Sequence, residues 1–256
     1  MKKNIGIIGF GAIGKSLYEQ FLAQGDTQVS FVYEIGEENA KLIPAALLIN
    51  SPNQLEAHLK AHSVDLVVET ATYQAVQELL PIILKHTDMA VFSTCAFADE
   101  AFYHLATGLA NTLDRRIFIP HGAILGLDGI SDGKGKLESV SITTIKKPVN
   151  LGRKDVERTV AFDGPTRTAC KLYPRNVNVH ASIAIAGLGF DQTHSQIIAD
   201  PEAAGNIHLI EIVAEGVTFK IEICSKPIGL VTGAYTPVSA FNSLHKLFSR
   251  KGLVII

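Results

Sequence analysis

The sequence predicts an α/β protein: a doubly wound parallel sheet, followed by a second α/β domain whose sheet is mostly antiparallel. Three observations predict this fold class. Apolar strands alternate with amphipathic helices in the first half, the first turn is rich in glycine, and strands with period-two alternation dominate the second half. We expect the first domain at residues 1–122 and the second at 123–233, and we expect the helical segment 234–256 to pack back on the first.

In the first half, a strand that ends at Ile8 precedes a helix whose apolar positions recur from Ile13 to Leu22, and a second strand follows at 29–33. Strand–helix alternation with short links gives a parallel sheet with right-handed crossovers, and ligands then bind beyond the carboxyl ends of its strands. The remaining elements expected here are a helical stretch at 42–49, strands at 63–69, 89–94 and 116–120, and helices at 73–84 and 102–113.

Beyond residue 130 the pattern changes to strands in which apolar and polar residues alternate. Such alternation predicts a mostly antiparallel sheet with one covered face. The strands expected in this half are 139–145, 159–164, 195–200, 207–212 and 217–223, and the helices are 179–188 and 237–248.

The turn after the first strand carries Gly9, Gly11 and Gly14 in the spacing G-x-G-x-x-G. In a dinucleotide-binding turn the first glycine makes the bend, the second lets the backbone approach a pyrophosphate, and the third lets the helix pack closely on the strand. The pyrophosphate then binds at the start of the helix, here Ala12 and Ile13, where unpaired N–H groups favour an anion. The turn therefore predicts a Rossmann domain that binds a nicotinamide dinucleotide.

The second strand ends on Glu34, about twenty positions after the glycines, where an acidic residue holds a ribose 2′-hydroxyl. The alternative is a solvated carboxylate in a loop. No Arg or Lys follows Glu34 closely, so the sequence favours NAD, with NADP possible. Ala71 lies on the same edge of the expected sheet, after the strand at 63–69, and joins the cofactor-binding set.

The composition excludes several classes of protein. The chain has 256 residues, 47% of them hydrophobic and 19% charged, and its formal net charge of −2 indicates no nucleic-acid partner. No apolar run approaches the roughly eighteen residues of a membrane span, and the start lacks the pattern of a signal peptide. Cys95, Cys170 and Cys224 are widely spaced, which argues against disulfides or a metal site and favours a reducing, cytoplasmic location.

Four segments in chain order resemble the L-aspartate dehydrogenase family. They are Phe-Ser-Thr-Cys-Ala-Phe-Ala-Asp-Glu at 92–100, Pro-His-Gly-Ala-Ile-Leu-Gly-Leu-Asp at 120–128, Tyr-Pro-Arg-Asn-Val-Asn-Val at 173–179 and Asp-Pro-Glu-Ala-Ala-Gly-Asn-Ile-His at 200–208. The resemblance implies a homodimer with NAD(P)-dependent oxidative deamination of L-aspartate as its activity. The product would be iminoaspartate, which feeds NAD biosynthesis or is hydrolysed to oxaloacetate and ammonia.

The same resemblance implies roles for individual residues. It places the catalytic histidine on His208, and contacts near the nicotinamide on Ala123, through its backbone, and on Asn178. Hydrolysis of an imine needs a base that titrates near neutral pH, which histidine supplies. The alternatives are a hydrogen-bonded histidine at a strand end for His208 and a helix cap for Asn178.

The partner of the substrate carboxylate and the role of His121 stay open from the sequence. For the substrate carboxylate we nominate Arg175 first, ahead of Lys146, Lys147 and Arg153. The alternative for Arg175 is a surface ion pair. His121, where the family more often has a small residue, would line the nicotinamide pocket or cap the next helix.

The family's Asn-Pro-Lys-Thr-Ser segment is replaced at 229–233, where the lysine is lost and only Thr232 survives, so another amino acid could be the substrate. Two alternatives for the function remain: a semialdehyde dehydrogenase with Cys95 as nucleophile, and a non-catalytic NAD-binding protein.

Overall fold

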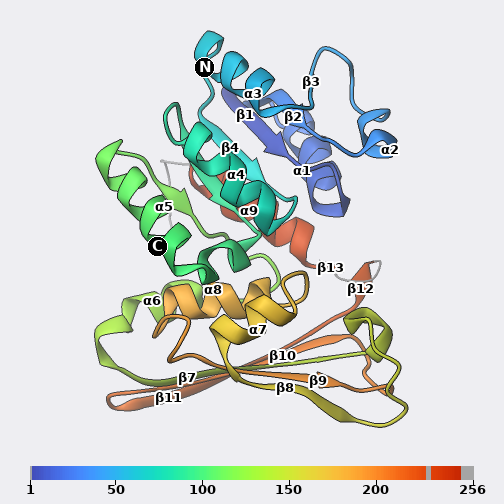
Figure 1. Cartoon of the computed structure of the whole chain (residues 1–256), viewed down its shortest axis with the longest axis vertical. Helices are drawn as coiled ribbons and strands as arrows, with labels where there is room; N and C mark the ends of the chain where they lie inside the picture. The colour runs from blue at the N-terminus through green and yellow to red at the C-terminus, as the bar shows by residue number, and fades with distance from the viewer. Residues whose placement is uncertain (1, 229–231, 249–256) are drawn as a thin grey trace. The chain divides into compact units, whose positions relative to one another are not determined.

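The computed structural model describes residues 2–228 and 232–248 (Figure 1). The described chain folds as two compact units. The first contains residues 2–96, 100–120 and 240–248, and the second contains residues 97–99, 121–228 and 232–239. Within these ranges no helix combines the length and apolar character that crossing a bilayer requires.

The first unit is built on a six-stranded parallel sheet in the order β3-β2-β1-β4-β5-β6, which confirms the doubly wound fold class. The order reverses between β1 and β4, and this is the point where such sheets bind ligands. The strands are β1 (Lys3–Ile8), β2 (Thr27–Tyr33), β3 (Leu48–Ile49), β4 (Leu66–Glu69), β5 (Asp88–Val91) and β6 (Ile117–Phe118). The helices are α1 (Ala12–Ala23), α2 (Glu37–Ala40), α3 (Pro52–Ala61), α4 (Tyr73–Ile83) and α5 (Glu100–Thr112).

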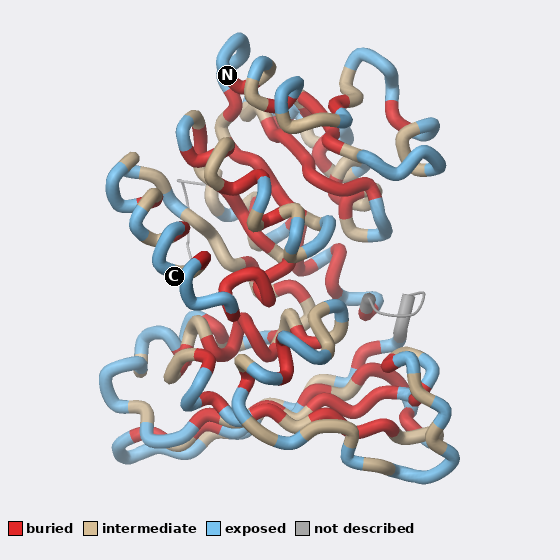
Figure 2. Tube along the Cα trace, viewed as in Figure 1, coloured by how far each residue is buried: buried red, intermediate tan, exposed pale blue. Residues whose placement is uncertain are grey.

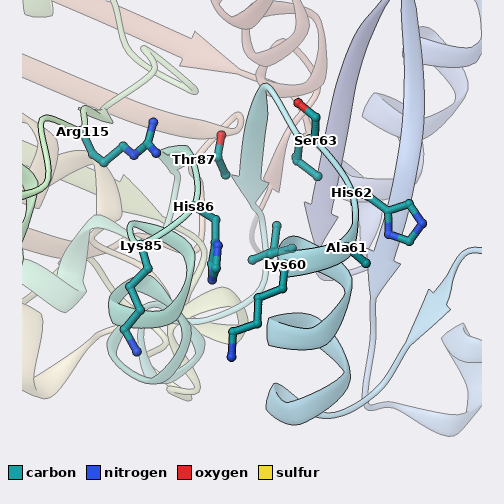
Figure 3. A pocket seen from close by; sticks show the side chains of 10 residues that line it. Lys60, Ala61, His62, Ser63, Lys85, His86, Thr87 and Arg115 are labelled. Atoms are coloured by element: carbon teal, nitrogen blue, oxygen red, sulfur yellow. The ribbon is translucent and has the colours of Figure 1, made fainter.

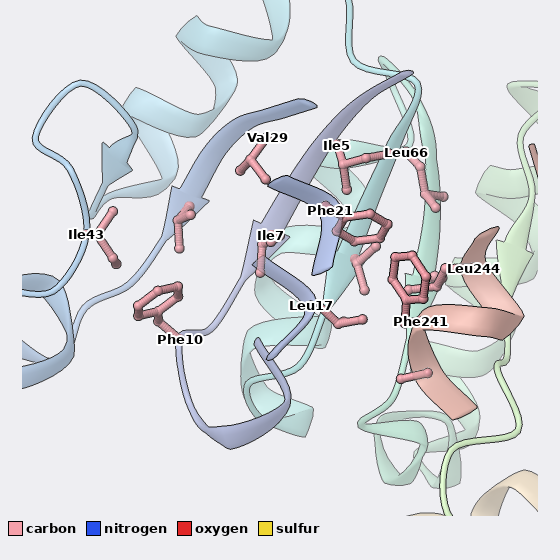
Figure 4. Packing of buried hydrophobic residues seen from close by; sticks show 14 residues of the cluster. Ile5, Ile7, Phe10, Leu17, Phe21, Val29, Ile43, Leu66, Phe241 and Leu244 are labelled. Carbon is pink, nitrogen blue, oxygen red and sulfur yellow. The ribbon is translucent and has the colours of Figure 1, made fainter. Parts of the chain in front are cut away.

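The core of this unit joins segments that are far apart in the sequence. Leu17 and Phe21 of α1 pack on β1, and Phe241 of α9 (Thr236–Lys246) packs on Phe21 with ring centroids 5.5 Å apart (Figure 4). All three side chains are at most 7% exposed. Helix α9 therefore contributes to the hydrophobic layer over one face of the parallel sheet.

The helix expected at 42–49 is wrong. The chain forms the short helix α2 at Glu37–Ala40, then turns, and then pairs Leu48–Ile49 with β2. Pro44 explains the difference, because proline has no N–H for a helical hydrogen bond and disfavours a helical conformation at the residue before it.

Helix α3, which the sequence analysis did not propose, follows directly. Ser51 is its N-cap, with Oγ accepting a hydrogen bond from the Gln54 N–H at 3.4 Å, and Pro52 occupies the first turn. Serine followed by proline is a recognisable helix start, so the signal was available.

The second unit holds a five-stranded sheet in the order β11-β10-β7-β9-β8, in which β7 and β9 are parallel and the other pairs are antiparallel. This confirms the mostly antiparallel prediction. The strands are β7 (Leu137–Lys146), β8 (Thr159–Pro165), β9 (His194–Ala199), β10 (Asn206–Ala214) and β11 (Val217–Ser225), with β12 (Pro227–Ile228) and β13 (Thr232–Gly233) as a separate pair. The helices are α6 (Leu127–Asp132), α7 (Thr166–Leu172) and α8 (Asn178–Ala186).

Helices α6, α7 and α8 lie over one face of this sheet, and burial alternates along its strands (Figure 2). On β10, His208, Ile210 and Ile212 are buried, whereas Leu209 and Glu211 are exposed. His208 therefore points to the helix-covered face, because neighbouring residues of a strand project to opposite faces.

Candidate active site

The glycine turn of the first unit has the geometry of a dinucleotide-binding turn. Gly9 has φ +87°, in the left-handed region that favours glycine, and a Cβ at Gly14 would collide with the carbonyl oxygen of Gly9. A Cβ at Gly11 would meet no atom within 4 Å in the described part of the chain. The packing of the protein thus explains Gly9 and Gly14, while the open space at Gly11 suits the approach of a ligand.

The turn leads into α1, whose N-terminus has Gly11 as its N-cap and no capping side chain among the described residues. The N–H groups of the first turn, which begins with Ala12 and Ile13, are therefore directed at an open site. Such a site binds phosphate readily, since the N–H groups and the helix dipole both favour an anion.

Glu34 lies beside the same turn. Its Oε2 accepts a hydrogen bond from the Phe10 N–H at 2.8 Å, and its Oε1 accepts one from the Gly36 N–H at 2.7 Å. These bonds fix the carboxylate at the end of β2 while each oxygen keeps a free lone pair for a hydroxyl. The predicted ribose contact and the predicted pyrophosphate site are thus neighbours in this unit.

Glu69 is a residue of this edge whose role the sequence analysis missed. It ends β4, it is fully buried, and its carboxylate accepts four hydrogen bonds: from the N–H groups of Ala71 (2.6 Å), Phe92 (3.2 Å) and Ser93 (2.9 Å), and from Ser93 Oγ (2.7 Å). Burial nevertheless raises the pKa of Glu69 to about 7. Glu69 ties the ends of β4 and β5 together and fixes Ala71, which contacts Gly9. A charged residue that ends an apolar strand is the signal that could have found it.

In the second unit, His208 belongs to a buried polar cluster. The register of β10 and β7 sets Thr144 opposite His208, and Thr144 Oγ1 lies 2.8 Å from His208 Nδ1 and 2.6 Å from Nε2 of His180 on α8. His208 is 3% exposed, and the other two side chains are fully buried. Within the described ranges no hydrogen bond occupies Nε2 of His208, so this nitrogen is left for a substrate or a water.

Lys146 belongs to the same cluster. It lies two residues after Thr144 on β7, on the same face, is 3% exposed, and has its Nζ 3.5 Å from Oδ1 of Asn176. Burial lowers the pKa of Lys146 to about 8, and burial together with the charge of Lys146 lowers the pKa of His208 to about 3. The pKa of His180 is also well below its usual value, first through burial and then through His208 and Lys146.

No carboxylate of the described chain contributes to these three shifts. Buried basic groups without an acidic partner are unfavourable in isolation, and strongly perturbed pKa values cluster at functional sites. Lys146 is therefore the group of this cluster that can receive an anion, next to His208.

The other predicted residues of this unit are Asn178, at the start of a helix, and Ala123, in a turn before one. Asn178 is the first residue of α8 and is half-buried, but Val177 is the N-cap, so Asn178 does not cap the helix. Ala123 is half-buried in the turn before α6. The N-cap of α6 is Gly126, so His121 does not cap this helix.

The structure also places two other sequence nominations. Arg175 is exposed, and Cys95 is 5% exposed, in the 3-10 helix Thr94–Ala98. Residues 229–231 of the altered segment 229–233 lie outside the described residues.

The first unit also has a cavity of about 390 Å³, which is distinct from the edge of the parallel sheet that carries the glycine turn and Glu34 (Figure 3). Its basic lining residues are Lys60, His62, Lys85, His86 and Arg115. Its lining segments directly precede β4, β5 and β6, so it lies at the amino ends of the strands. The coenzyme site, in contrast, belongs to the carboxyl ends.

Comparisons with known proteins cover both units. A family model described as the NAD binding domain of homoserine dehydrogenase matches residues 9–120, and one described as the C-terminal part of aspartate dehydrogenase matches residues 128–247. The L-aspartate dehydrogenases of Methanococcoides burtonii and Thermotoga maritima are each 35% identical to the chain, over 95% of its length and 96% and 97% of theirs.

Solved structures extend the likeness. The crystal structure of aspartate dehydrogenase from Thermotoga maritima matches with a TM-score of 0.79 and 31% identity, over 99% of this chain and 100% of that one. A scyllo-inositol dehydrogenase from Lactobacillus casei matches with a TM-score of 0.57 at 11% identity, over 97% of this chain and 87% of that one, which is a likeness of fold alone.

The buried carboxyl of Glu69 predicts a specific pH dependence of stability. Because its pKa is higher in the folded chain (about 7) than the usual 4.5, its stabilising contribution is complete below pH 4.5 and is lost as pH rises through 7. Relative to Glu69→Gln, which does not titrate, the wild type should lose roughly 3 kcal/mol of unfolding free energy between pH 4.5 and 8. Urea unfolding of both proteins across this range measures the difference, and parallel stability curves would contradict the prediction.

Proposed function

Because this chain belongs to the L-aspartate dehydrogenase family, we propose that it oxidises L-aspartate to iminoaspartate with NAD as the hydride acceptor. The observation that carries the proposal is the buried side chain of Lys146 beside His208, which has no carboxylate partner among the described residues and suits a dicarboxylate substrate. The chain pairs this cluster with a dinucleotide-binding turn, as an amino-acid dehydrogenase requires.

The residues of the first unit fit a nicotinamide dinucleotide. Gly11 and the N–H groups at Ala12 and Ile13 would hold the pyrophosphate, Glu34 the ribose hydroxyls, and Ala71 would line the same edge. The carboxylate of Glu34 would repel a 2′-phosphate, which supports NAD over NADP. When bound, the coenzyme accepts a hydride at its nicotinamide ring, and we assign the contacts near that ring to Ala123 and Asn178.

Lys146 is our choice for the partner of a substrate carboxylate. The family's lysine before the last helix is lost at 229–233, and the first sequence nominee, Arg175, is exposed. Lys146 instead presents a buried ammonium beside His208, where a charge-assisted hydrogen bond to a carboxylate is strong. This supports aspartate as the substrate despite the altered segment.

His208 is the proposed general base. Hydride loss from Cα and loss of a proton from the substrate nitrogen leave a C=N bond, and water then adds to the imine carbon while Nε2 of His208 takes a proton from it. The resulting carbinolamine expels ammonia and leaves oxaloacetate. A bound dicarboxylate would raise the pKa of His208 from about 3 towards neutrality, since nearby negative charge favours the imidazolium.

Membership in the L-aspartate dehydrogenase family argues against the rival function with a cysteine nucleophile at Cys95. The presence of His208 within a built polar cluster argues against a protein that binds NAD without chemistry.

The assembly and location are also part of the proposal. We expect a homodimer, as the family resemblance implies, and the outward face of the five-stranded sheet offers a surface for it, because Leu209 and Val160 are 37% and 55% exposed there. Light scattering that gives the mass of a single chain at micromolar concentration would contradict the dimer. Cys95, Cys170 and Cys224, all within the described residues, form no disulfide, which supports our expectation of a reducing, cytoplasmic location.

His208→Ala should lower kcat for aspartate oxidation by about a hundredfold or more, the usual loss for a general base, and leave the Kd of NADH unchanged. NADH absorbance with aspartate and NAD at alkaline pH measures turnover, and NADH fluorescence measures binding. His194→Ala is the matched control, because His194 is a half-exposed histidine of the same sheet, on β9, which β7 separates from β10. Unchanged turnover in His208→Ala would remove His208 from the mechanism, and a wild type that forms no NADH would refute the activity.

Lys146→Met should raise KM for aspartate about 10- to 100-fold, which corresponds to the loss of one charge-assisted hydrogen bond. Lys147→Met is the control, because Lys147 is the exposed neighbour in the chain. In the wild type, competitive inhibition by succinate, a dicarboxylate without an amine, should weaken as pH rises through 8, where Lys146 loses its charge. Inhibition that stays constant from pH 7 to 10 would show that Lys146 does not bind the carboxylate.

A further inference from the structure

The polar cluster continues behind His208 as an unbroken line of hydrogen bonds. Every side chain in it is at most 3% exposed, and the line crosses strands β10, β7 and β9 and helices α8 and α7. The links are His208 Nδ1 to Thr144 Oγ1 (2.8 Å), Thr144 Oγ1 to His180 Nε2 (2.6 Å), His180 Nδ1 to Ser195 Oγ (2.8 Å), Ser195 Oγ to Thr166 Oγ1 (2.7 Å), and Thr166 Oγ1 to the Thr193 carbonyl oxygen (2.9 Å).

The end of the line at Thr193 fixes the direction of the hydrogen bonds nearest to it. The carbonyl oxygen of Thr193 can only accept, so the hydroxyl of Thr166 donates its single proton to it. The oxygen of Thr166 is then an acceptor for Ser195, whose own single proton points to Thr166. The hydroxyl of Ser195 has no proton left for His180.

The same reasoning passes through His180 to His208. Ser195 accepts from the Nδ1–H of His180, and burial keeps His180 neutral because its pKa is well below the usual value. The Nε2 of His180 therefore carries a lone pair and accepts the proton of Thr144. Thr144 in turn accepts from the Nδ1–H of His208, so the lone pair of His208 lies on Nε2.

We propose that this line of hydrogen bonds is a tautomer lock: the Thr193 carbonyl, acting through Thr166, Ser195, His180 and Thr144, holds His208 with Nδ1 protonated and Nε2 free to act as a base. The four side chains between the carbonyl and His208 are positioning residues, and none of them needs to touch the substrate. The tautomer lock adds positioning residues to the proposed function. Its effect on catalysis rests on the proposed role of His208 as the base.

The line does not conduct protons away from the site. A proton wire needs an exit, whereas this line ends on a peptide carbonyl that cannot be protonated at ordinary pH. A proton taken up by Nε2 of His208 must therefore leave from Nε2, towards the substrate side. The line sets which nitrogen reacts and has no part in carrying the proton.

Thr166→Val tests the lock at the position furthest from His208 that still carries a side chain of the line. Valine has the shape of threonine but cannot accept from Ser195, so Ser195 is free to donate to His180 and every following bond can reverse. The reversed line puts the proton on Nε2 of His208. We expect kcat to fall about tenfold or more, with KM for aspartate and the Kd of NADH within about twofold of wild type, because a base histidine held in the wrong tautomer loses up to about 10⁴ in rate.

The direct readout is the protonation of each ring nitrogen, from ¹⁵N chemical shifts of histidine-labelled protein without ligands. His208→Gln and His180→Gln assign the two buried rings among the nine histidines. Wild type and the conservative Thr166→Ser should show His208 with an unprotonated Nε2 and should have kcat within about twofold of each other. Thr166→Val should show loss of that signal.

Ser195→Ala breaks the same line one link closer and guards against a folding defect in Thr166→Val, with the melting temperature measured for both. A fall in kcat without a change of tautomer in both variants, or an unchanged tautomer and kcat, would overturn the lock. The ¹⁵N readout needs no turnover, so it decides on the lock even if His208→Ala shows that the proposed mechanism is wrong.

Discussion

Lys146, His180 and His208 are buried together in the second unit, and taking a basic side chain out of water costs free energy unless an opposite charge compensates for it. The two histidines avoid the cost by staying neutral, as their lowered pKa values indicate, whereas Lys146 is poised between its two forms with a pKa of about 8. The protein supplies no carboxylate to this cluster in its described part. The charge of Lys146 is therefore left to be compensated by an anionic ligand. The rest of the unit can be understood from this constraint.

The sheet and its covering helices make the cluster possible. Period-two alternation directs Thr144 and Lys146 of β7 to the same face as His208, and the strand register aligns Thr144 with His208. Helix α8 packs on this face, with Ala181 and Ala184 buried in it, and its His180 reaches both Thr144 and Ser195. Precise polar contacts thus depend on ordinary apolar packing.

The sequence predicted what is encoded locally. The glycine turn and the position of Glu34 after β2 are short-range patterns. So are the strand–helix alternation of the first unit and the apolar–polar alternation within strands of the second. The two main sheets confirm the fold class that these patterns predict. The helix expected at 42–49 from apolar spacing does not form, because Pro44 within it disfavours a helix.

The polar line could not be predicted, since Thr144, Thr166, His180, Ser195 and His208 are distant in sequence and meet only through tertiary pairing. Lys146 ranked low for a related reason, because a lysine's burial is not visible in sequence. A neutral anchor for His208 has a chemical advantage at such a site. An aspartate behind the imidazole would also orient it, but the permanent charge of the aspartate would pair with Lys146 and repel the substrate carboxylates. A line of hydroxyls that ends on a peptide carbonyl fixes the imidazole without adding charge, so Lys146 stays available to a carboxylate from outside.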